Sequence, residues 1–171
     1  IPEQLINMPK YKAINLHGSL LPKLRGASPV QTAIIEGHDV TGVTLMEMTK
    51  EMDAGKMYDK EEVVIDYEDN NTTLCEKIKE AALNLAIRSV PAYLNGDLVG
   101  VEQDLNLVTF ANLIKPEKEK LDLTNTKEQL RNYIRGLADN PGAYFYLNDK
   151  KLKVYKARII SDEILGQVGD I

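Results

Sequence analysis

An asparagine and a histidine that share one strand face are the residues of this sequence best placed to do chemistry. Asn15 and His17 end the apolar segment 11–17, and a loop follows at Gly18. Side chains alternate between the two faces of a strand, so both lie on one face, about 6.5 Å apart at about 3.3 Å per residue. This pattern places an amide beside an imidazole at the carboxyl end of a strand, where α/β proteins present reactive groups.

One carboxylate has a comparable setting. Asp53 follows an apolar strand and precedes Ala54-Gly55 in a turn. An Asn, a His and an Asp brought together suit acyl transfer, because the amide and the imidazole can hydrogen-bond an oxyanion while the carboxylate orients the ring. Spacing alone leaves another interpretation open. In it, His17 caps the strand end, Asn15 hydrogen-bonds the backbone of a turn, and Asp53 is an N-cap or a surface turn residue.

Other chemistries have weaker support. The sequence has no cysteine pair, no His-rich spacing for a zinc site, no Walker-type phosphate loop and no G-x-S-x-G elbow, so we expect no metal. The single cysteine, Cys75, lies in a helical pattern and is expected to be a buried or half-buried apolar residue. His38 follows a helix end and is more typical of an exposed turn.

The composition is that of a globular protein of one or two domains. Of 171 residues, 43% are hydrophobic and 27% are charged, and no apolar run approaches the roughly 18 residues that a membrane span needs. No secretory leader opens the chain, so we expect a cytoplasmic location and no membrane partner. The net charge of −5 argues against nucleic-acid binding by bulk charge, although it permits a local basic face.

Hydrophobic periodicity predicts an α/β module in the first part of the chain. Thr73 and Glu76 form a capping box before a long amphipathic helix. The strand that ends at His17 is as apolar as strands inside parallel sheets, yet only ten residues precede it, so we expect a fragment of a longer protein. The predicted elements are a helix that starts at Ser28-Pro29 and ends at Gly37, strands over 41–48 and 57–65, and a helix over 72–94 that ends at Asn95-Gly96.

A Lys/Glu-rich stretch, residues 115–120, leads into a second module. Thr126 and Gln129 form a capping box before a helix of about three turns. Too few strands follow to close a barrel, so we expect this module to be truncated as well. The predicted strands are 143–147 and 152–160, joined through Asn148-Asp149, and a third that begins at 166–168.

Taken in order, these motifs resemble the signature of the 10-formyltetrahydrofolate-dependent formyltransferases. Residues 15–26 read Asn-x-His-Gly-Ser-Leu-Leu-Pro-x-x-Arg-Gly, residues 41–44 read Thr-Gly-Val-Thr, and residues 52–55 read Met-Asp-Ala-Gly. The second module, with Ile-Arg-Gly-Leu at 134–137 and a lysine-rich strand over 150–157, resembles the appended barrel of the methionyl-tRNA formyltransferases.

The resemblance implies an α/β fold, with part of a Rossmann-like formyltransferase sheet followed by part of a small OB-like β-barrel domain. Residues 1–98 would form the C-terminal half of the catalytic domain, residues 99–120 a linker, and residues 121–171 the start of the barrel domain. The first part of the catalytic domain and the end of the barrel would be absent. We therefore expect the fragment alone to be inactive.

The activity that the resemblance implies is transfer of a formyl group from the cosubstrate 10-formyltetrahydrofolate to the α-amino group of initiator methionyl-tRNA, in translation initiation. Asn15, His17 and Asp53 fall on the catalytic positions. Arg25 would shape the site or form a salt bridge to the sheet edge. Four residues fall on the folate-binding loop, where the leucines line the pocket or pack beneath it: Ser19, Leu20, Leu21 and Pro22.

The predicted hairpin is basic, and we expect it to contact tRNA, because a small barrel that binds an acceptor stem needs cations for the phosphates. The plain alternative is a solvated charged face. A formyltetrahydrofolate hydrolase or a sugar-nucleotide formyltransferase would share the trio, and a non-catalytic tRNA-binding remnant also fits. We expect a monomer. The basic residues are Lys150, Lys151, Lys153, Lys156 and Arg158.

Overall fold

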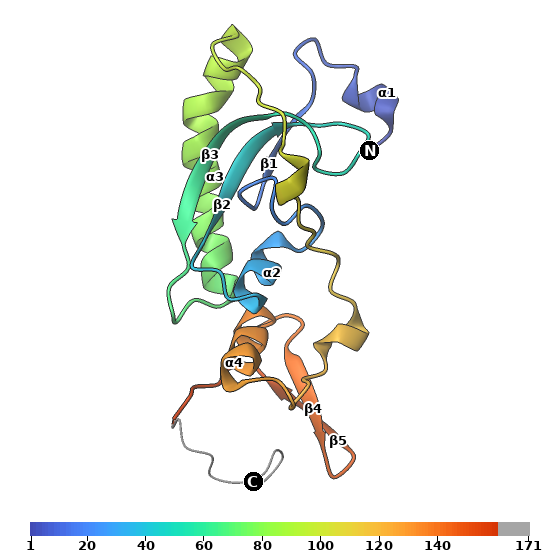
Figure 1. Cartoon of the computed structure of the whole chain (residues 1–171), viewed down its shortest axis with the longest axis vertical. Helices are drawn as coiled ribbons and strands as arrows, with labels where there is room; N and C mark the ends of the chain where they lie inside the picture. Colours follow the sequence, from blue (N-terminus) through green and yellow to red (C-terminus); the bar gives the residue numbers. More distant parts are fainter. Residues whose placement is uncertain (161–171) are drawn as a thin grey trace.

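The structure, a computed structural model, describes residues 1–160 of the chain. Two modules follow each other along the molecule, one around a three-stranded sheet and one around a two-stranded sheet (Figure 1). The elements are, in order, α1 (Glu3–Ile6), β1 (Ile14–His17), α2 (Pro29–Ile35), β2 (Val40–Glu47), β3 (Met57–Val64), α3 (Asn71–Asn95), the short 3₁₀ helices η1 (Leu105–Leu107) and η2 (Pro116–Glu119), α4 (Lys127–Gly136), β4 (Ala143–Leu147) and β5 (Lys150–Val154).

The first sheet has the order β1-β2-β3, and both pairings are antiparallel. Asn15 lies opposite Met46, and His17 lies opposite Thr44. Among the described residues, β1 has one neighbour in this sheet, β2, and the sequence led us to expect further neighbours from a part of the protein outside this chain. A parallel crossover must return the chain to the start of the first strand, whereas the loop and α2 leave it beyond His17, where β2 begins and runs back.

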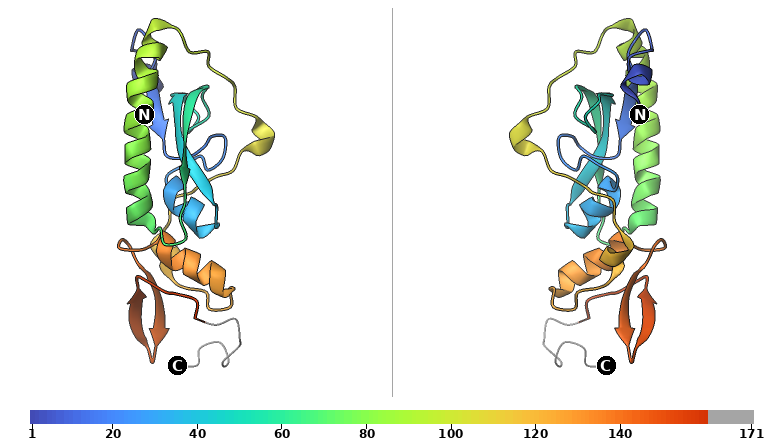
Figure 2. Two further views of the ribbon diagram at one scale, coloured as in Figure 1. Left: turned by 90° about the vertical axis from the view of Figure 1, so that its left-hand side faces the viewer. Right: turned by 90° about the vertical axis from the view of Figure 1, so that its right-hand side faces the viewer.

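The core of the first module lies between the sheet and α3, which covers one face of the sheet along its length (Figure 2). The chain after α3 runs over the opposite face (Figure 2). The buried side chains of β2 and α3 belong to one apolar cluster, and they include Val43, Leu45, Leu74, Ile78 and Leu85. The face that carries Asn15 and His17 therefore lies away from α3.

The long helix begins one position earlier than its sequence pattern predicts. Its capping box joins Asn70 to Thr73: the Asn70 side chain accepts from the Thr73 N–H at 3.0 Å, and the Thr73 hydroxyl accepts from the Asn70 N–H at 3.0 Å. The predicted box of Thr73 with Glu76 is wrong, because Asn70 is the better N-cap and Glu76 pairs with Lys79 instead. The helix ends at Asn95 with Gly96 as its C-cap, as predicted.

In the second module, the capping box of Thr126 and Gln129 starts α4 as predicted. β4 has its predicted bounds, and the Asn148-Asp149 turn has both φ values positive, at 47° and 62°, as tight hairpins require. β5 runs from Lys150 to Val154, and so begins earlier and ends earlier than the predicted strand 152–160. The two-residue turn pairs Val154 with Ala143, where β4 begins, so later residues have no partner on β4. The predicted strand at 166–168 lies outside the described residues.

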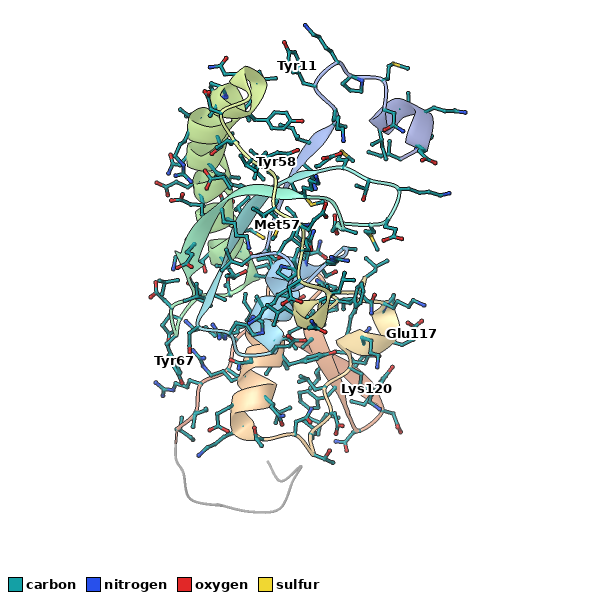
Figure 3. All side chains as sticks on the ribbon, turned by 45° about the horizontal axis from the view of Figure 1, so that its top comes forward. Tyr11, Met57, Tyr58, Tyr67, Glu117 and Lys120 are labelled. Atoms are coloured by element: carbon teal, nitrogen blue, oxygen red, sulfur yellow. The ribbon has the colours of Figure 1, made fainter. Side chains whose placement is uncertain are left out.

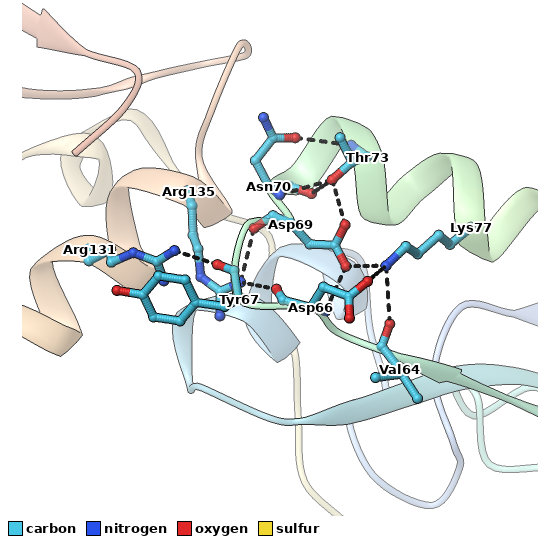
Figure 4. Close-up of polar contacts among 9 residues, drawn as sticks. All are labelled: Val64, Asp66, Tyr67, Asp69, Asn70, Thr73, Lys77, Arg131 and Arg135. Atoms are coloured by element: carbon cyan, nitrogen blue, oxygen red, sulfur yellow. Dashed lines mark hydrogen bonds and ion pairs between the residues drawn. The ribbon is translucent and has the colours of Figure 1, made fainter. Parts of the chain in front are cut away.

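Helix α4 joins the second module to the first. It packs against α2, and two of its arginines reach the turn that precedes α3 (Figure 4). Arg131 is buried, donates to the carbonyl oxygen of Tyr67 and lies 3.4 Å from the centre of the Tyr67 ring. Arg135 donates to the carbonyl oxygens of Asp66 and Asp69, and its burial beside Arg131 lowers its pKa. The two modules are therefore held together by direct contacts.

Replacing Arg131 should weaken this attachment. Arg131→Met removes a charged donor and leaves the Tyr67 carbonyl without it, so we expect the free energy of unfolding to fall by about 1.5–3 kcal/mol. Chemical denaturation measures the change. The control is Lys79→Met, which removes an exposed ion pair on α3 and should leave the midpoint unchanged. Equal midpoints for the two variants would contradict the proposed role of Arg131.

Candidate active site

His17 and Asp53 meet at the end of β1. His17 is buried, with 5% of its surface exposed. Its Nδ1 lies 3.6 Å from Oδ2 of Asp53, and its Nε2 lies 3.0 Å from the carbonyl oxygen of Leu24. Both ring nitrogens face oxygen acceptors, so the ring donates to both only when it carries two protons. The structure thus brings together two of the three predicted catalytic residues.

A turn in the left-handed backbone region orients the Asp53 carboxylate. Asp53 has a φ of 54°, a region that aspartate adopts more readily than most side chains. Its Oδ2 accepts a hydrogen bond of 2.8 Å from the backbone N–H of Gly26. Two residues on, a Cβ at Gly55 would lie 2.0 Å from the carbonyl oxygen of Glu47, so only glycine fits there. The turn is thereby pressed against the end of β2.

Asn15 meets Asp53 at a cavity. It lies on the same sheet face as His17 and lines a cavity of about 220 Å³ together with Asp53. His17 is not among the residues that line this cavity, although its ring contacts Asp53, which does line it. The other lining residues are Ile1, Ile6, Met46, Met48, Thr49, Lys50 and Met52. The cavity therefore holds an amide and a carboxylate among mainly apolar side chains.

Buried hydrogen bonds hold the loop of residues 19–22 in place. Ser19 and Leu21 are fully buried; the Ser19 hydroxyl donates to the carbonyl oxygen of Lys23 at 2.6 Å. The Thr44 hydroxyl donates to the Ser19 carbonyl at 2.7 Å and accepts from the Leu21 N–H at 3.0 Å. Lys60 donates to the Leu21 carbonyl, and burial lowers the pKa of that ammonium group.

The remaining loop residues face a second cavity. Leu20 and Pro22 are half-buried and line a space of about 430 Å³ with Val40 and Leu107. This space is separate from the one that Asn15 and Asp53 line. Both predicted leucines line this cavity, but Leu20 is half-buried whereas Leu21 has no exposed surface.

Gln103 is part of this site, and sequence patterns did not indicate it. Its side-chain amide donates to the carbonyl oxygens of Asp53 and Gly55, both at 2.8 Å. Its Oε1 accepts from Nε and Nη2 of Arg25, at 3.0 and 2.8 Å. Arg25 was predicted to shape the site or to form a salt bridge, and in the structure its buried guanidinium binds this amide. Gln103 lies in the predicted linker, where no periodicity marks it.

The hairpin distributes its predicted tRNA-contacting residues over two faces. Residues paired directly across an antiparallel ladder share a face, so Lys151 lies with Tyr146, and Lys153 with Tyr144. The Lys151 ammonium lies 3.7 Å from the Tyr144 ring centre. Lys120 lies 5.8 Å from the Tyr146 ring, beside the hairpin (Figure 3).

The other predicted basic residues lie elsewhere. Lys150 pairs with Leu147 and so lies on the opposite face, while Lys156 and Arg158 follow the end of β5. We define the aromatic–basic face as Lys120, Tyr144, Tyr146, Lys151 and Lys153.

Cys75 and His38, for which the sequence predicted no catalytic role, are both partly exposed. Cys75 is half-buried in α3, and burial raises the pKa of its thiol. His38 lies 3.2 Å from Glu36, with 30% of its side chain exposed.

Within residues 1–160, no group of three or more His, Cys, Asp or Glu side chains is arranged to hold a metal ion. None of the helices in that part is long and apolar enough to cross a membrane.

Two family descriptions match this chain. One, for formyl transferase, matches residues 1–90, and the other, for the C-terminal domain of formyl transferase, matches residues 113–171. The first covers more than half of the 171 residues. The chain belongs to the formyl transferase family.

Curated formyl transferases resemble this chain along its whole length. It is 42% identical to a methionyl-tRNA formyltransferase of Streptococcus pneumoniae and 38% identical to one of Lactobacillus acidophilus, each over all 171 residues. The chain spans 54% of the length of each of these relatives.

A solved formyl transferase shares the fold. The N-formyltransferase of Helicobacter canadensis, in complex with folinic acid and dTDP-3-aminofucose, superposes with a TM-score of 0.75 over 91% of this chain and 57% of that one. The two sequences are 21% identical. The α/β fold predicted from the sequence, part of a formyltransferase fold, is thereby confirmed.

The hydroxyl of Thr44 should matter more than that of Thr41, although both residues are buried on β2. Thr44→Val deletes the two hydrogen bonds that hold the loop of residues 19–22, so we expect a loss of about 1–3 kcal/mol in the free energy of unfolding. Thr41→Val is the matched control, because the Thr41 hydroxyl has no hydrogen-bond partner among residues 1–160. Equal losses in chemical denaturation would contradict the assigned role of Thr44.

Proposed function

We propose that the whole protein transfers a formyl group from 10-formyltetrahydrofolate to the α-amino group of initiator methionyl-tRNA. The observation that carries this proposal is the contact between His17 and Asp53 beside the cavity that Asn15 lines. The names of the two curated relatives, which match the whole chain, support the choice of acceptor. We place the reaction in the cytoplasm, where translation initiates.

The reaction is an acyl transfer. The neutral α-amine of the methionyl group attacks the formyl carbon on N10 of the folate, which forms a carbon–nitrogen bond and a tetrahedral oxyanion. The Asn15 amide donates to this oxyanion, and His17, which does not line the cavity, acts on the site by positioning the Asp53 carboxylate. The carbon–N10 bond then breaks, and the proton lost by the attacking amine passes to N10. The products are formylmethionyl-tRNA and tetrahydrofolate.

The size of the cavity limits what it can bind. Pockets for drug-sized ligands measure about 300–1,000 Å³. The cavity beside Asn15 and Asp53, at about 220 Å³ in this part of the protein, has room for the formyl-bearing part of the folate. The folate contact of Ser19, Leu20, Leu21 and Pro22 rests on the family resemblance. In that loop Leu20 and Pro22 have the accessible side chains.

Formyl transfer to initiator methionyl-tRNA by the full-length protein tests the proposal. Asn15→Ala should lower turnover by about 10²–10³, the usual cost of one missing oxyanion donor, with an unfolding midpoint near that of the parent. His17→Ala should lower turnover as well and should also lower the unfolding midpoint, because it removes a buried ring and the partner of Asp53. Lys79→Ala is the control, because Lys79 is exposed on α3, on the opposite side of the sheet from Asn15, and lines neither cavity. Turnover near the parent value in either site variant would overturn the assignment.

The aromatic–basic face supports tRNA as the partner. Lysines neutralise phosphates, and exposed tyrosines offer rings on which unpaired bases stack. Tyr146 is 54% exposed, with Lys151 and Lys120 close to the two rings of this face. We propose that Lys151 and Lys153 contribute most to the binding. Lys150, Lys156 and Arg158 remain predicted tRNA-binding residues outside that face.

The salt dependence of tRNA binding tests this surface. Replacing both Lys151 and Lys153 by Gln should lower the slope of log K against log salt by about 0.7–0.9 for each phosphate that the protein no longer neutralises. Lys150→Gln, on the opposite face of the hairpin, should change the slope less. An unchanged slope in the double variant would exclude this face as the tRNA-binding surface.

A sugar-nucleotide formyltransferase is the second candidate. It is favoured by the fold that this chain shares with the Helicobacter canadensis enzyme, whose structure holds dTDP-3-aminofucose. A formyltetrahydrofolate hydrolase would use the same trio with water as the acceptor. Parallel assays of the full-length protein with methionyl-tRNA, a dTDP-aminosugar and no acceptor distinguish the three activities.

A further inference from the structure

We propose that Gln103 is a positioning residue for the Asp53 carboxylate, and that the segment between the two modules thereby completes the active site. The inference rests on the proposed formyl transfer. Gln103 lies in residues 91–112, between the two parts of the chain that the family descriptions match.

The segment that carries Gln103 is fixed on both sides. Before it, Val101 and Met57 exchange backbone hydrogen bonds of 2.9 and 2.8 Å at the edge of β3 (Figure 3 marks Met57). After it, the Arg25 N–H donates to the Thr109 carbonyl at 2.9 Å, and the Ala111 N–H donates to the Arg25 carbonyl at 2.7 Å. Gln103 is therefore held beside the catalytic turn by the backbone as well as by its own side chain.

Gln103 is buried, unlike its two neighbours in the chain. It has 7% of its surface exposed, whereas Glu102 and Asp104 on either side are exposed. Its amide donates to the carbonyls of Asp53 and Gly55, the two residues that flank Ala54 in the turn. Holding both carbonyls fixes the orientation of the turn. The Asp53 carboxylate, which stands on that turn, is thereby directed at His17 and at the N–H of Gly26.

The partners of the amide determine which way it faces. Arg25 has only donors, and the carbonyls of Asp53 and Gly55 only accept. The amide oxygen must therefore face Arg25, and the NH₂ group must face the turn, as observed. The two bonds from the guanidinium also polarise the amide and strengthen its donor end. A glutamate in this position would place an oxygen against two carbonyl oxygens.

Gln103→Glu in the full-length protein is the direct test, because it keeps the size of the side chain and the bonds from Arg25 but removes both donors. We expect kcat to fall by about 10–100-fold, as for small misplacements of catalytic groups, and KM for the folate to change by less than about threefold. Glu102→Gln is the matched control, since it makes the reverse change at the exposed neighbour and should leave kcat unaltered. If Gln103→Glu does not fold, Gln103→Met is measured in its place.

A double-mutant cycle with Asp53→Asn separates positioning from a merely structural role. If Gln103 acts through Asp53, the double variant should be no slower than Asp53→Asn alone. If the kcat losses of the two single variants multiply in the double variant, the inference is overturned. It is also overturned if the Gln103 variant has a kcat within twofold of the parent. No formyl transfer by the parent protein would overturn the proposed function and this inference with it. Transfer by the parent with an unaffected Gln103 variant would overturn the inference alone.

Discussion

One carboxylate oxygen joins the parts of the site. Oδ2 of Asp53 accepts from the Gly26 N–H at 2.8 Å and lies 3.6 Å from Nδ1 of His17. These three residues come from the end of β1, the loop after it and the turn after β2, so their meeting depends on tertiary structure. The Asp53 carboxylate is stable beside the largely buried His17 ring, because each of the two side chains is hydrogen-bonded to the surrounding backbone.

The segment after His17 serves both the site and the packing of the two modules. Its loop is held by Thr44 and Lys60, and it continues directly into α2, which packs against α4 of the second module. On the other side, residues 101–111 are hydrogen-bonded to the first module around Gln103. The predicted linker is therefore, for much of its length, part of the first module. The aromatic–basic face is attached to the candidate active site through packed helices.

Local patterns predicted much of this structure. Period-two alternation placed Asn15 and His17 on one face, and the Asn148-Asp149 turn and the capping box at Thr126 predicted the second module's helix and hairpin. Features that depend on distant partners were not predictable. Gln103 is a polar residue in irregular chain, and only its hydrogen bonds across the fold reveal its position. The basic residues are divided between two faces by the pairing register of β4 and β5, which the geometry of the Asn148-Asp149 turn sets.

We propose that formyl transfer takes place in the cavity beside Asn15 and Asp53. A crystal structure of the full-length protein with 5-formyltetrahydrofolate, a stable formyl folate, tests it most directly. We predict that the end of the folate that carries the formyl group lies in that cavity, with Asn15 within hydrogen-bond distance of the formyl oxygen. Folate bound instead in the cavity beside Leu20 and Pro22, away from Asn15, would contradict the claim.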